Sequence, residues 1–228
     1  MDNDWDRIWP SLAEIKVVSN PHNEVVTVCN MADDVRCIGV GTDAAVFQSV
    51  HQPKYAFKIY AEDKREKVAV EASVYQTLGD VSYFPHCFAT TEKGLVLSYE
   101  AGKTLYDCIV EGIHIPACVV DAVEEARDYI RSRGLNPRDI HLKNIILQDG
   151  QVKIIDVSEY QKTGDDFRWE HLQKAYKQYY HLIDGRAVPL WLVEAIRKRY
   201  NQQRRQSFSY DDFVKSILRF VYKLTKVE

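Results

Sequence analysis

Three oxygen-bearing side chains, Asp139, Asn144 and Asp156, lie close together in the sequence. An Asp-Gly pair separates two apolar runs, 145–147 and 152–155, and Asp-Gly between β-prone runs is a strong signal for a β-hairpin. Such a hairpin holds Asn144 and Asp156 side by side at the ends of its strands. Phosphoryl transfer needs cations that neutralise phosphates and a carboxylate that orients the attacking hydroxyl. The segment therefore favours a phosphotransfer centre.

Residues 137–144 read PRDIHLKN, and residues 156–158 read DVS. In the protein kinase signature the catalytic loop reads H-R-D-L-x-x-x-N, and a D-F-G motif follows it. The two segments resemble the protein kinase-like superfamily, as a divergent member in which proline replaces the histidine and Val-Ser replaces Phe-Gly. The resemblance implies that Asp139 is the catalytic base and that Asn144 and Asp156 bind Mg²⁺. An ordinary surface loop before a hairpin is the alternative, because Asp and Asn are frequent turn formers.

A glycine-rich turn lies upstream, where residues 38–47 read IGVGTDAAVF. Glycine lets a backbone approach phosphates closely because it has no Cβ. A plain hairpin turn is the alternative, whereas a dinucleotide-binding fold is disfavoured because a β-prone run, and not a helix, follows the turn. The resemblance implies that this loop contacts ATP, although Ala44 replaces the third glycine of the kinase pattern. The expected contacts are Gly39, Val40, Gly41, Ala44 and Val46.

The next strand-like run, 54–60, places Ala56 and Lys58 on one face. It resembles the kinase V-A-I-K strand, which makes Lys58 the candidate for the α and β phosphates and Ala56 part of the ATP site. Glu71 lies on the apolar side of a helical segment, 61–78. It is expected to pair with Lys58, because a buried carboxylate is tolerable only beside a cation. Glu66 is the nearest competitor for this role.

Two further strand-like runs, 84–91 and 94–99, precede a segment that resembles the kinase hinge. In the hinge, backbone groups meet the adenine edge, and Glu100 and Ala101 are the expected pair. The resemblance implies an α+β, two-lobed protein kinase-like fold with an antiparallel sheet and one helix in the small lobe. The expected divisions are an N-lobe at 1–99, a hinge at 100–103, and a reduced, mostly helical C-lobe at 104–228.

Helical periodicity indicates a long helix from Ile115 to Arg133 and three later helices at about 166–182, 189–202 and 210–224. The segment after Asp156 is short and lacks the Ala-Pro-Glu that ends a kinase activation segment. In regulated kinases an arginine beside the catalytic aspartate helps to receive a phosphate on that segment. Arg138 is expected instead to hold a fixed acidic or carbonyl partner, with Asp165 or Asp166 as the nearest acidic candidates.

His141 lies two positions after Asp139. Many protein kinases carry lysine there, whereas choline and aminoglycoside kinase-like enzymes often carry histidine; loop packing is the alternative role. Three functions remain open. The favoured one is an ATP-dependent, serine/threonine protein kinase-like enzyme, and the others are a kinase of a small hydroxylated molecule and a catalytically silent nucleotide-binding scaffold. His141 favours a small acceptor, whereas Lys143 does not, and the scaffold is least favoured because all five kinase-like groups are present.

The overall composition indicates which classes of binding partner to expect. The 228 residues carry a formal net charge of -3, so no basic field favours nucleic acid. Five cysteines without C-x-x-C spacing favour reduced thiols over a disulfide or zinc frame. No stretch approaches the roughly 20 apolar residues that a membrane helix requires. We therefore expect a cytoplasmic kinase with ATP and Mg²⁺, a protein or small hydroxylated acceptor, no nucleic-acid partner and no membrane span.

Overall fold

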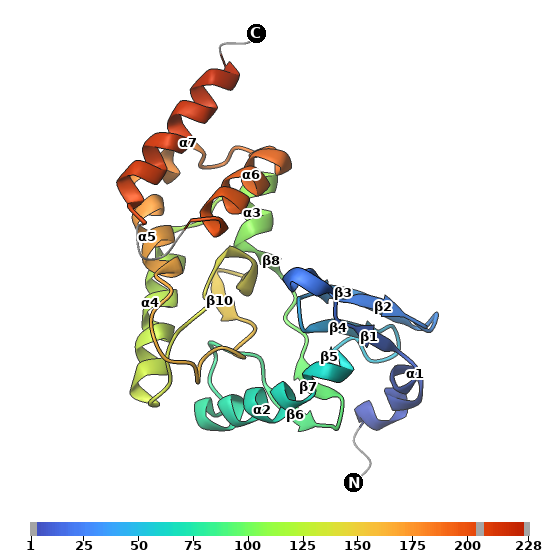
Figure 1. Ribbon diagram of the computed structural model, residues 1–228. Helices are drawn as coiled ribbons and strands as arrows, with labels where there is room; N and C mark the ends of the chain where they lie inside the picture. Colours follow the sequence, from blue (N-terminus) through green and yellow to red (C-terminus); the bar gives the residue numbers. More distant parts are fainter. Residues whose placement is uncertain (1–3, 204–207, 226–228) are drawn as a thin grey trace.

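The computed structural model describes residues 4–203 and 208–225. A five-stranded antiparallel sheet with strand order β3-β4-β5-β7-β6 forms the first lobe, and one long helix, α2, packs against it (Figure 1). The sequence pattern predicted these strands and this helix. Their bounds are Val35–Val40 for β3, Ala44–Ser49 for β4, Tyr55–Tyr60 for β5, Cys87–Thr90 for β6, Gly94–Ser98 for β7 and Glu66–Leu78 for α2.

Helix α2 begins later than the expected residue 61. Residues Glu62–Lys64 form a separate 3₁₀ turn, η3, because Ala61 has an extended backbone with ψ at 151°. The helix buries Val68, Glu71, Val74 and Leu78. This spacing places the Glu71 carboxylate on the face that packs against the sheet.

The N-terminal segment covers the other face of the sheet. Its 3₁₀ turn and helix bury Ile8 and Leu12 in one cluster with Phe47 and Phe57. The central strand β5 is therefore covered on both faces, which explains why every residue of β5 is buried. The covering elements are η1 Asp4–Ile8, α1 Trp9–Ala13, β1 Lys16–Val18, η2 Pro21–Asn23 and β2 Thr27–Cys29, with β1 antiparallel to β2.

Strands β5 and β7 approach closely beside Lys58. A Cβ on Gly94 would lie 1.8 Å from the Lys58 carbonyl oxygen. Only glycine fits at this point, and β7 pairs with β5 so that Leu95 lies opposite Lys58. The backbone that carries Lys58 is thus held on both sides by neighbouring strands.

The second lobe is mostly helical and surrounds a small sheet of order β10-β9-β8 (Figure 1). A capping box between Thr104 and Asp107 starts its first helix, α3. The long helix α4 ends just before Gly134, which has a positive φ of 75°. The elements are β8 Lys103–Thr104, α3 Leu105–Glu111, α4 Ala117–Ser132, η4 Leu142–Asn144, β9 Ile145–Gln148, β10 Gln151–Ile154, α5 Arg168–Tyr179, η5 Tyr180–Leu182, α6 Leu190–Asn201 and α7 Tyr210–Thr225.

One hydrophobic cluster joins the two lobes. Leu78 of α2 and Phe84 lie in the same cluster as Ile130 of α4 and Ile154 of β10. Tyr160, which is 1% exposed, contacts Phe84 edge-on with ring centroids 6.4 Å apart. This packing fixes where the end of the β9–β10 hairpin lies relative to α2. In the part of the chain described, no helix is both long and apolar enough to cross a bilayer.

Candidate active site

The predicted hairpin is confirmed. Strands β9 and β10 pair with Ile145 opposite Ile154, and the Ile155 N–H donates to the Asn144 carbonyl oxygen at 2.9 Å. Asn144 and Asp156 therefore lie at the same end of the hairpin. The Asn144 side-chain amide donates to the Asp139 carbonyl oxygen at 3.1 Å, which attaches Asp139 to the same corner.

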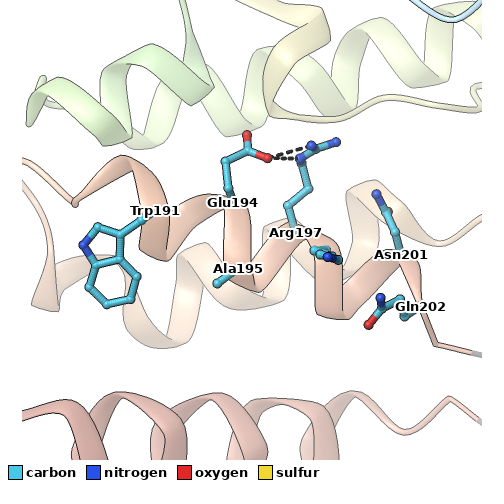
Figure 2. Close-up of a pocket in the computed structure, with 7 residues that line it drawn as sticks. Trp191, Glu194, Ala195, Arg197, Asn201 and Gln202 are labelled. Atoms are coloured by element: carbon cyan, nitrogen blue, oxygen red, sulfur yellow. Dashed lines mark hydrogen bonds and ion pairs between the residues drawn. The ribbon is translucent and has the colours of Figure 1, made fainter. Parts of the chain in front are cut away.

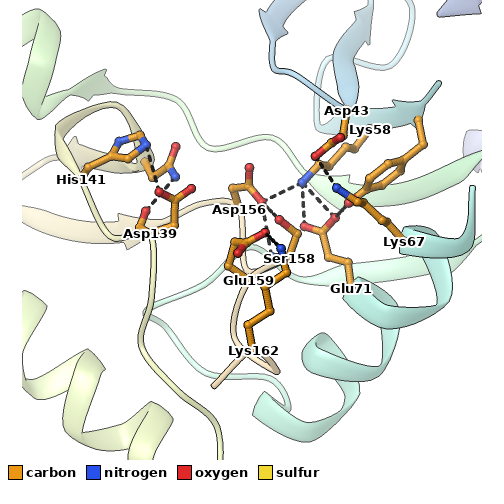
Figure 3. Close-up of polar contacts among 12 residues, drawn as sticks. Asp43, Lys58, Lys67, Glu71, Asp139, His141, Asp156, Ser158, Glu159 and Lys162 are labelled. Atoms are coloured by element: carbon orange, nitrogen blue, oxygen red, sulfur yellow. Dashed lines mark hydrogen bonds and ion pairs between the residues drawn. The ribbon is translucent and has the colours of Figure 1, made fainter. Parts of the chain in front are cut away.

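Lys58 is the centre of a buried ionic group (Figure 3). Its ammonium nitrogen lies 2.9 Å from the Glu71 carboxylate and 3.0 Å from Asp156 Oδ1. The Tyr60 hydroxyl also donates to Glu71, whose side chain is 0% exposed. The predicted pairing of Lys58 with Glu71 is confirmed, and the competitor Glu66 is exposed to solvent.

The charges in this group support one another. Burial disfavours the Lys58 ammonium, but the carboxylates of Asp156 and Glu71 raise the pKa of Lys58 well above its usual value. Desolvation likewise opposes ionisation of Asp156, yet Lys58 and the Ser158 hydroxyl lower the pKa of Asp156 to about 2. The Asp156 side chain is 40% exposed, so a ligand can reach it. At neutral pH the corner thus presents an ionised carboxylate beside a cation.

Asp139 sits in a left-handed backbone conformation with φ at 56°. Its N–H donates to Asp166 Oδ2 at 2.8 Å, and its Oδ1 lies 2.9 Å from Arg168 Nη1 and 3.8 Å from His141 Nε2. Burial raises the pKa of Asp139 to about 6; Arg168 opposes this rise, whereas Asp156 adds to it. This aspartate is therefore a stronger base than an exposed one and is still mainly ionised at neutral pH.

His141 is a neutral imidazole in this setting. Burial, aided by the Arg168 charge, lowers the pKa of His141 to about 4. Its Nδ1 accepts the Lys143 N–H at 3.3 Å, which assigns the ring proton to Nε2, the nitrogen nearest Asp139. The predicted site residues Asp139 and His141 thus face each other within the 137–144 loop (Figure 3).

Arg138 binds carbonyl oxygens, which was one of the two predicted kinds of partner. Its Nη1 donates to Thr163 O at 2.6 Å and to Gly164 O at 2.5 Å. The predicted acidic candidates do not take this role: Asp165 accepts the N–H of Phe167, and Asp166 accepts the N–H of Asp139. The carboxylates of Asp165 and Asp166 bind backbone N–H groups at the turn before α5 and in the loop. Arg138 therefore binds the backbone carbonyl oxygens instead.

The glycine-rich turn connects β3 and β4, and its tip is attached to α2. The Gly41 N–H donates to Ala44 O at 2.8 Å, and the Asp43 carboxylate lies 2.7 Å from Lys67 Nζ (Figure 3). Sequence reasoning did not single out Asp43 or Lys67. Gly39 pairs with Val46 across the turn. The remaining residues expected at ATP are Val40 on β3 and Ala56 on β5.

The expected hinge pair follows β7. Glu100 accepts a hydrogen bond from Ser98 Oγ at 2.5 Å and lies 3.7 Å from Lys153 Nζ, and its side chain is 9% exposed. Ala101 is exposed. Because the Glu100 side chain is held inward, the groups of these two residues that can bind a ligand are their backbone N–H and C=O groups.

The donor set at the hairpin corner fits Mg²⁺ held jointly with phosphates. Asp156 engages Lys58 and Ser158 through Oδ1 alone. Asn144 uses its amide nitrogen toward Asp139, so its amide oxygen is not engaged in that bond. The described residues contain no cluster of three or more histidine, cysteine or carboxylate side chains that could hold a metal by itself. Mg²⁺ ordinarily binds through one or two carboxylates plus substrate phosphates, which matches this sparse set.

A surface hollow on α6 is lined in part by Glu194 and Arg197 (Figure 2). Glu194, which lines the hollow, lies 3.2 Å from Lys143 Nζ and 2.6 Å from Arg197 Nη2. The Lys143 ammonium also lies over the Tyr106 ring, 4.3 Å from its centroid. Lys143 is therefore directed toward α6 and α3.

The chain is similar to a curated protein in sequence and to a solved structure in part of its fold. No protein-family model matches the chain. A Bacillus subtilis (strain 168) protein named "Putative serine/threonine-protein kinase YrzF" is 29% identical over 204 residues, which cover 85% of this chain and 95% of that protein. The crystal structure of Rad53 1-466 in complex with AMP-PNP matches with a TM-score of 0.44 and 22% identity, over 64% of this chain and 38% of that one.

The sheet lobe with one helix and the helical lobe that carries the hairpin form the α+β, two-lobed protein kinase-like fold that the sequence predicted. The similarity to the Bacillus subtilis protein covers 85% of this chain and therefore extends over both lobes.

Proposed function

We propose that this protein is an ATP-dependent phosphotransferase that moves the γ-phosphate to a hydroxyl group, with a serine/threonine protein kinase-like acceptor as the favoured class. One observation carries the proposal: Lys58, Glu71 and Asp156 come from a strand, a helix and a hairpin and meet within 3.0 Å. Burying such a group is unfavourable unless its charges are paired. The Lys58 ammonium can bind nucleotide phosphates directly, and the adjacent Asp156 carboxylate can bind a metal ion that the phosphates also contact. The name of the Bacillus subtilis relative is consistent with this activity.

The remaining predicted residues are assigned roles within the same proposal. Lys58 binds the α and β phosphates, and Asn144 and Asp156 hold Mg²⁺, which would neutralise phosphate charge when bound. The backbone of Glu100 and Ala101 meets the adenine edge. The turn residues Gly39, Val40, Gly41, Ala44 and Val46, together with Ala56, line the nucleotide. The proposed divisions are an N-lobe at 1–99, a hinge at 100–103 and a C-lobe at 104–228.

In the transfer step the acceptor hydroxyl oxygen attacks the γ-phosphorus, and the bond from that phosphorus to the β,γ-bridging oxygen breaks. ADP leaves, and the hydroxyl proton passes to the carboxylate of Asp139. The raised pKa of Asp139, about 6, makes this carboxylate a better proton acceptor while it stays ionised at neutral pH. The Asp166 contact to its backbone N–H supports the orientation of the loop.

A small hydroxylated acceptor is the second candidate. It is favoured by the neutral imidazole of His141 beside Asp139 and by the short segment between Asp156 and α5, which offers little surface for a peptide. The silent scaffold is disfavoured because Asn144 contacts Asp139, Lys58 contacts Glu71 and Asp156, and Asn144 and Asp156 flank the same end of the hairpin.

The decisive experiment incubates the protein with labelled ATP and Mg²⁺, alone, with a generic protein acceptor and with a panel of small alcohols. Label on protein or alcohol identifies the acceptor class. In parallel, MgATP at about 100 times its dissociation constant should stabilise the fold by roughly 2.7 kcal/mol, seen as a rise in Tm. No rise at millimolar MgATP, with no label transferred, would reject the proposed function.

We expect the transfer rate to be level near neutral pH and to fall about tenfold per pH unit below pH 6, because Asp139 accepts a proton only when ionised and its pKa is about 6. His141, with a pKa of about 4, stays neutral over this range. The measurement is kcat against pH for the parent and for His141→Gln. The pH at which kcat is half its maximum should be the same in both proteins. If this pH shifts in His141→Gln, the titration does not belong to Asp139 alone, and the prediction is wrong.

We also expect activity to be independent of phosphorylation after Asp156. Arg138 already donates hydrogen bonds to the Thr163 and Gly164 carbonyls, so it is not available to bind a phosphate on this segment. Tyr160 is 1% exposed, so a kinase cannot reach its hydroxyl. The test is Tyr160→Phe combined with Thr163→Val, compared with phosphatase-treated parent protein. A rate within a few-fold of the parent is expected. A loss of about 100-fold, or roughly 2.7 kcal/mol of barrier, would contradict it.

A further inference from the structure

We infer that Arg168, the first residue of α5, is a catalytic residue that supplies the positive charge beside Asp139 and stabilises the phosphoryl group in flight. The inference rests on the proposed function and adds to it a residue that the kinase-like motifs do not contain. The inference is drawn from the ion pair between Arg168 Nη1 and Asp139 Oδ1, which are 2.9 Å apart.

Arg168 is held in place by its own turn. Asp166 accepts the Arg168 N–H at 3.2 Å through Oδ1, and its Oδ2 accepts the Asp139 N–H at 2.8 Å. The Asp166 side chain is 7% exposed, so this link is well shielded. One carboxylate thus fixes the start of α5 against the catalytic loop, and Arg168 extends from that fixed point to Asp139. The guanidinium is positioned by the fold rather than by a chance surface contact.

The other nearby cations are directed elsewhere. Lys58 lies between Glu71 and Asp156, and Lys143 contacts Glu194 at 3.2 Å. His141 contributes no charge, since its Nδ1 accepts a backbone N–H and leaves the neutral ring with one proton on Nε2. Among the ion pairs that the described residues form with Asp139, the arginine pair is the short one, at 2.9 Å against 3.8 Å for histidine. Arg168 is therefore the cation at this position.

The arrangement leaves room for an acceptor. Arg168 and His141 both approach Asp139 at Oδ1, and the inference assigns Oδ2 to the incoming hydroxyl. Arg168 and Asp139 are partly exposed, at 29% and 31% of their side chains, which makes the pair reachable. A planar guanidinium has five N–H donors, and one contact to Asp139 leaves others for phosphate oxygens. As the γ-phosphorus passes from the β,γ-bridging oxygen to the acceptor oxygen, negative charge spreads over its other oxygens, and a fixed cation there lowers the barrier.

The test compares Arg168→Gln, Arg168→Lys and parent protein. The control is Arg131→Gln, because Arg131 is an exposed arginine on α4 that pairs with Asp128. The readouts are ADP release from MgATP, with water or a generic protein as acceptor, the KM for ATP, and Tm with and without MgATP. For Arg168→Gln we expect kcat to fall about 100- to 1,000-fold, with the KM for ATP and both Tm values close to those of the control. Arg168→Lys should recover at least about tenfold of this loss, because it keeps the charge.

Two results would overturn the inference. Arg168→Gln could turn over as fast as the parent, or faster, in which case the ion pair only blocks the base. It could also lose MgATP stabilisation and kcat together, which indicates a structural role. Millimolar guanidinium added to Arg168→Gly separates these cases from a folding defect, because partial recovery of turnover is expected only if the missing group is the cation. Failure of the proposed function itself is seen differently: the parent protein would then release no ADP, and the inference falls with it.

Discussion

Replacing Lys58 with methionine is expected to abolish stabilisation by MgATP and to lower the free energy of unfolding by about 3 to 5 kcal/mol. The Glu71 side chain is 0% exposed and accepts hydrogen bonds from the Tyr60 hydroxyl and from the Lys58 ammonium. Without the ammonium, a buried carboxylate lacks its cation. Urea unfolding with and without MgATP measures both effects on one protein.

Two variants make this result specific. Lys54→Met removes an exposed lysine that pairs with Asp4 just before β5, and it should change stability by less than about 1 kcal/mol. The double variant Lys58→Met, Glu71→Leu removes both partners, so much of the stability should return while MgATP binding stays absent. Normal MgATP stabilisation in Lys58→Met would show that the lysine does not face the phosphates.

The second large effect is on turnover. Asp139→Asn is expected to lower kcat by about 10²- to 10⁴-fold, because an amide cannot accept the hydroxyl proton. Nucleotide binding should be nearly intact, since the proposed contacts to ATP come from Lys58 and the metal ligands. Asp156→Asn should weaken both, because it removes the charged ligand of Mg²⁺ and one partner of Lys58.

The measurement is kcat together with the dissociation constant for MgATP in each variant. Asp128→Asn is a suitable control, because Asp128 lies on the exposed side of α4 and its side chain is 76% exposed. It should leave both quantities unchanged. Equal loss of nucleotide binding in Asp139→Asn and Asp156→Asn would mean that the base and metal-ligand roles are assigned wrongly.

The sequence alone determined the parts of the site that depend on local spacing. The Asp-Gly turn between two β-prone runs placed Asn144 and Asp156 at one end of a hairpin, as β9 and β10 show. Strand alternation and helical periodicity turned Lys58 and Glu71 toward the same core, where they meet at 2.9 Å. These relations follow from the periods of strand and helix, which a linear pattern carries. The start of α2 was less well predicted, because the extended backbone of Ala61 leaves no trace in hydrophobic periodicity.

Only the tertiary structure decided what surrounds Asp139. The pairing of Asp139 with Arg168 and the bond from its N–H to Asp166 depend on how the start of α5 packs against the catalytic loop. The sequence indicates Asp166 only as a candidate partner of Arg138, which binds backbone carbonyls instead. The link from Asp43 to Lys67 likewise joins a turn to a helix. Charged side chains on exposed turns and first helical turns look alike in sequence. Their partners are chosen by three-dimensional packing, which no periodic pattern encodes.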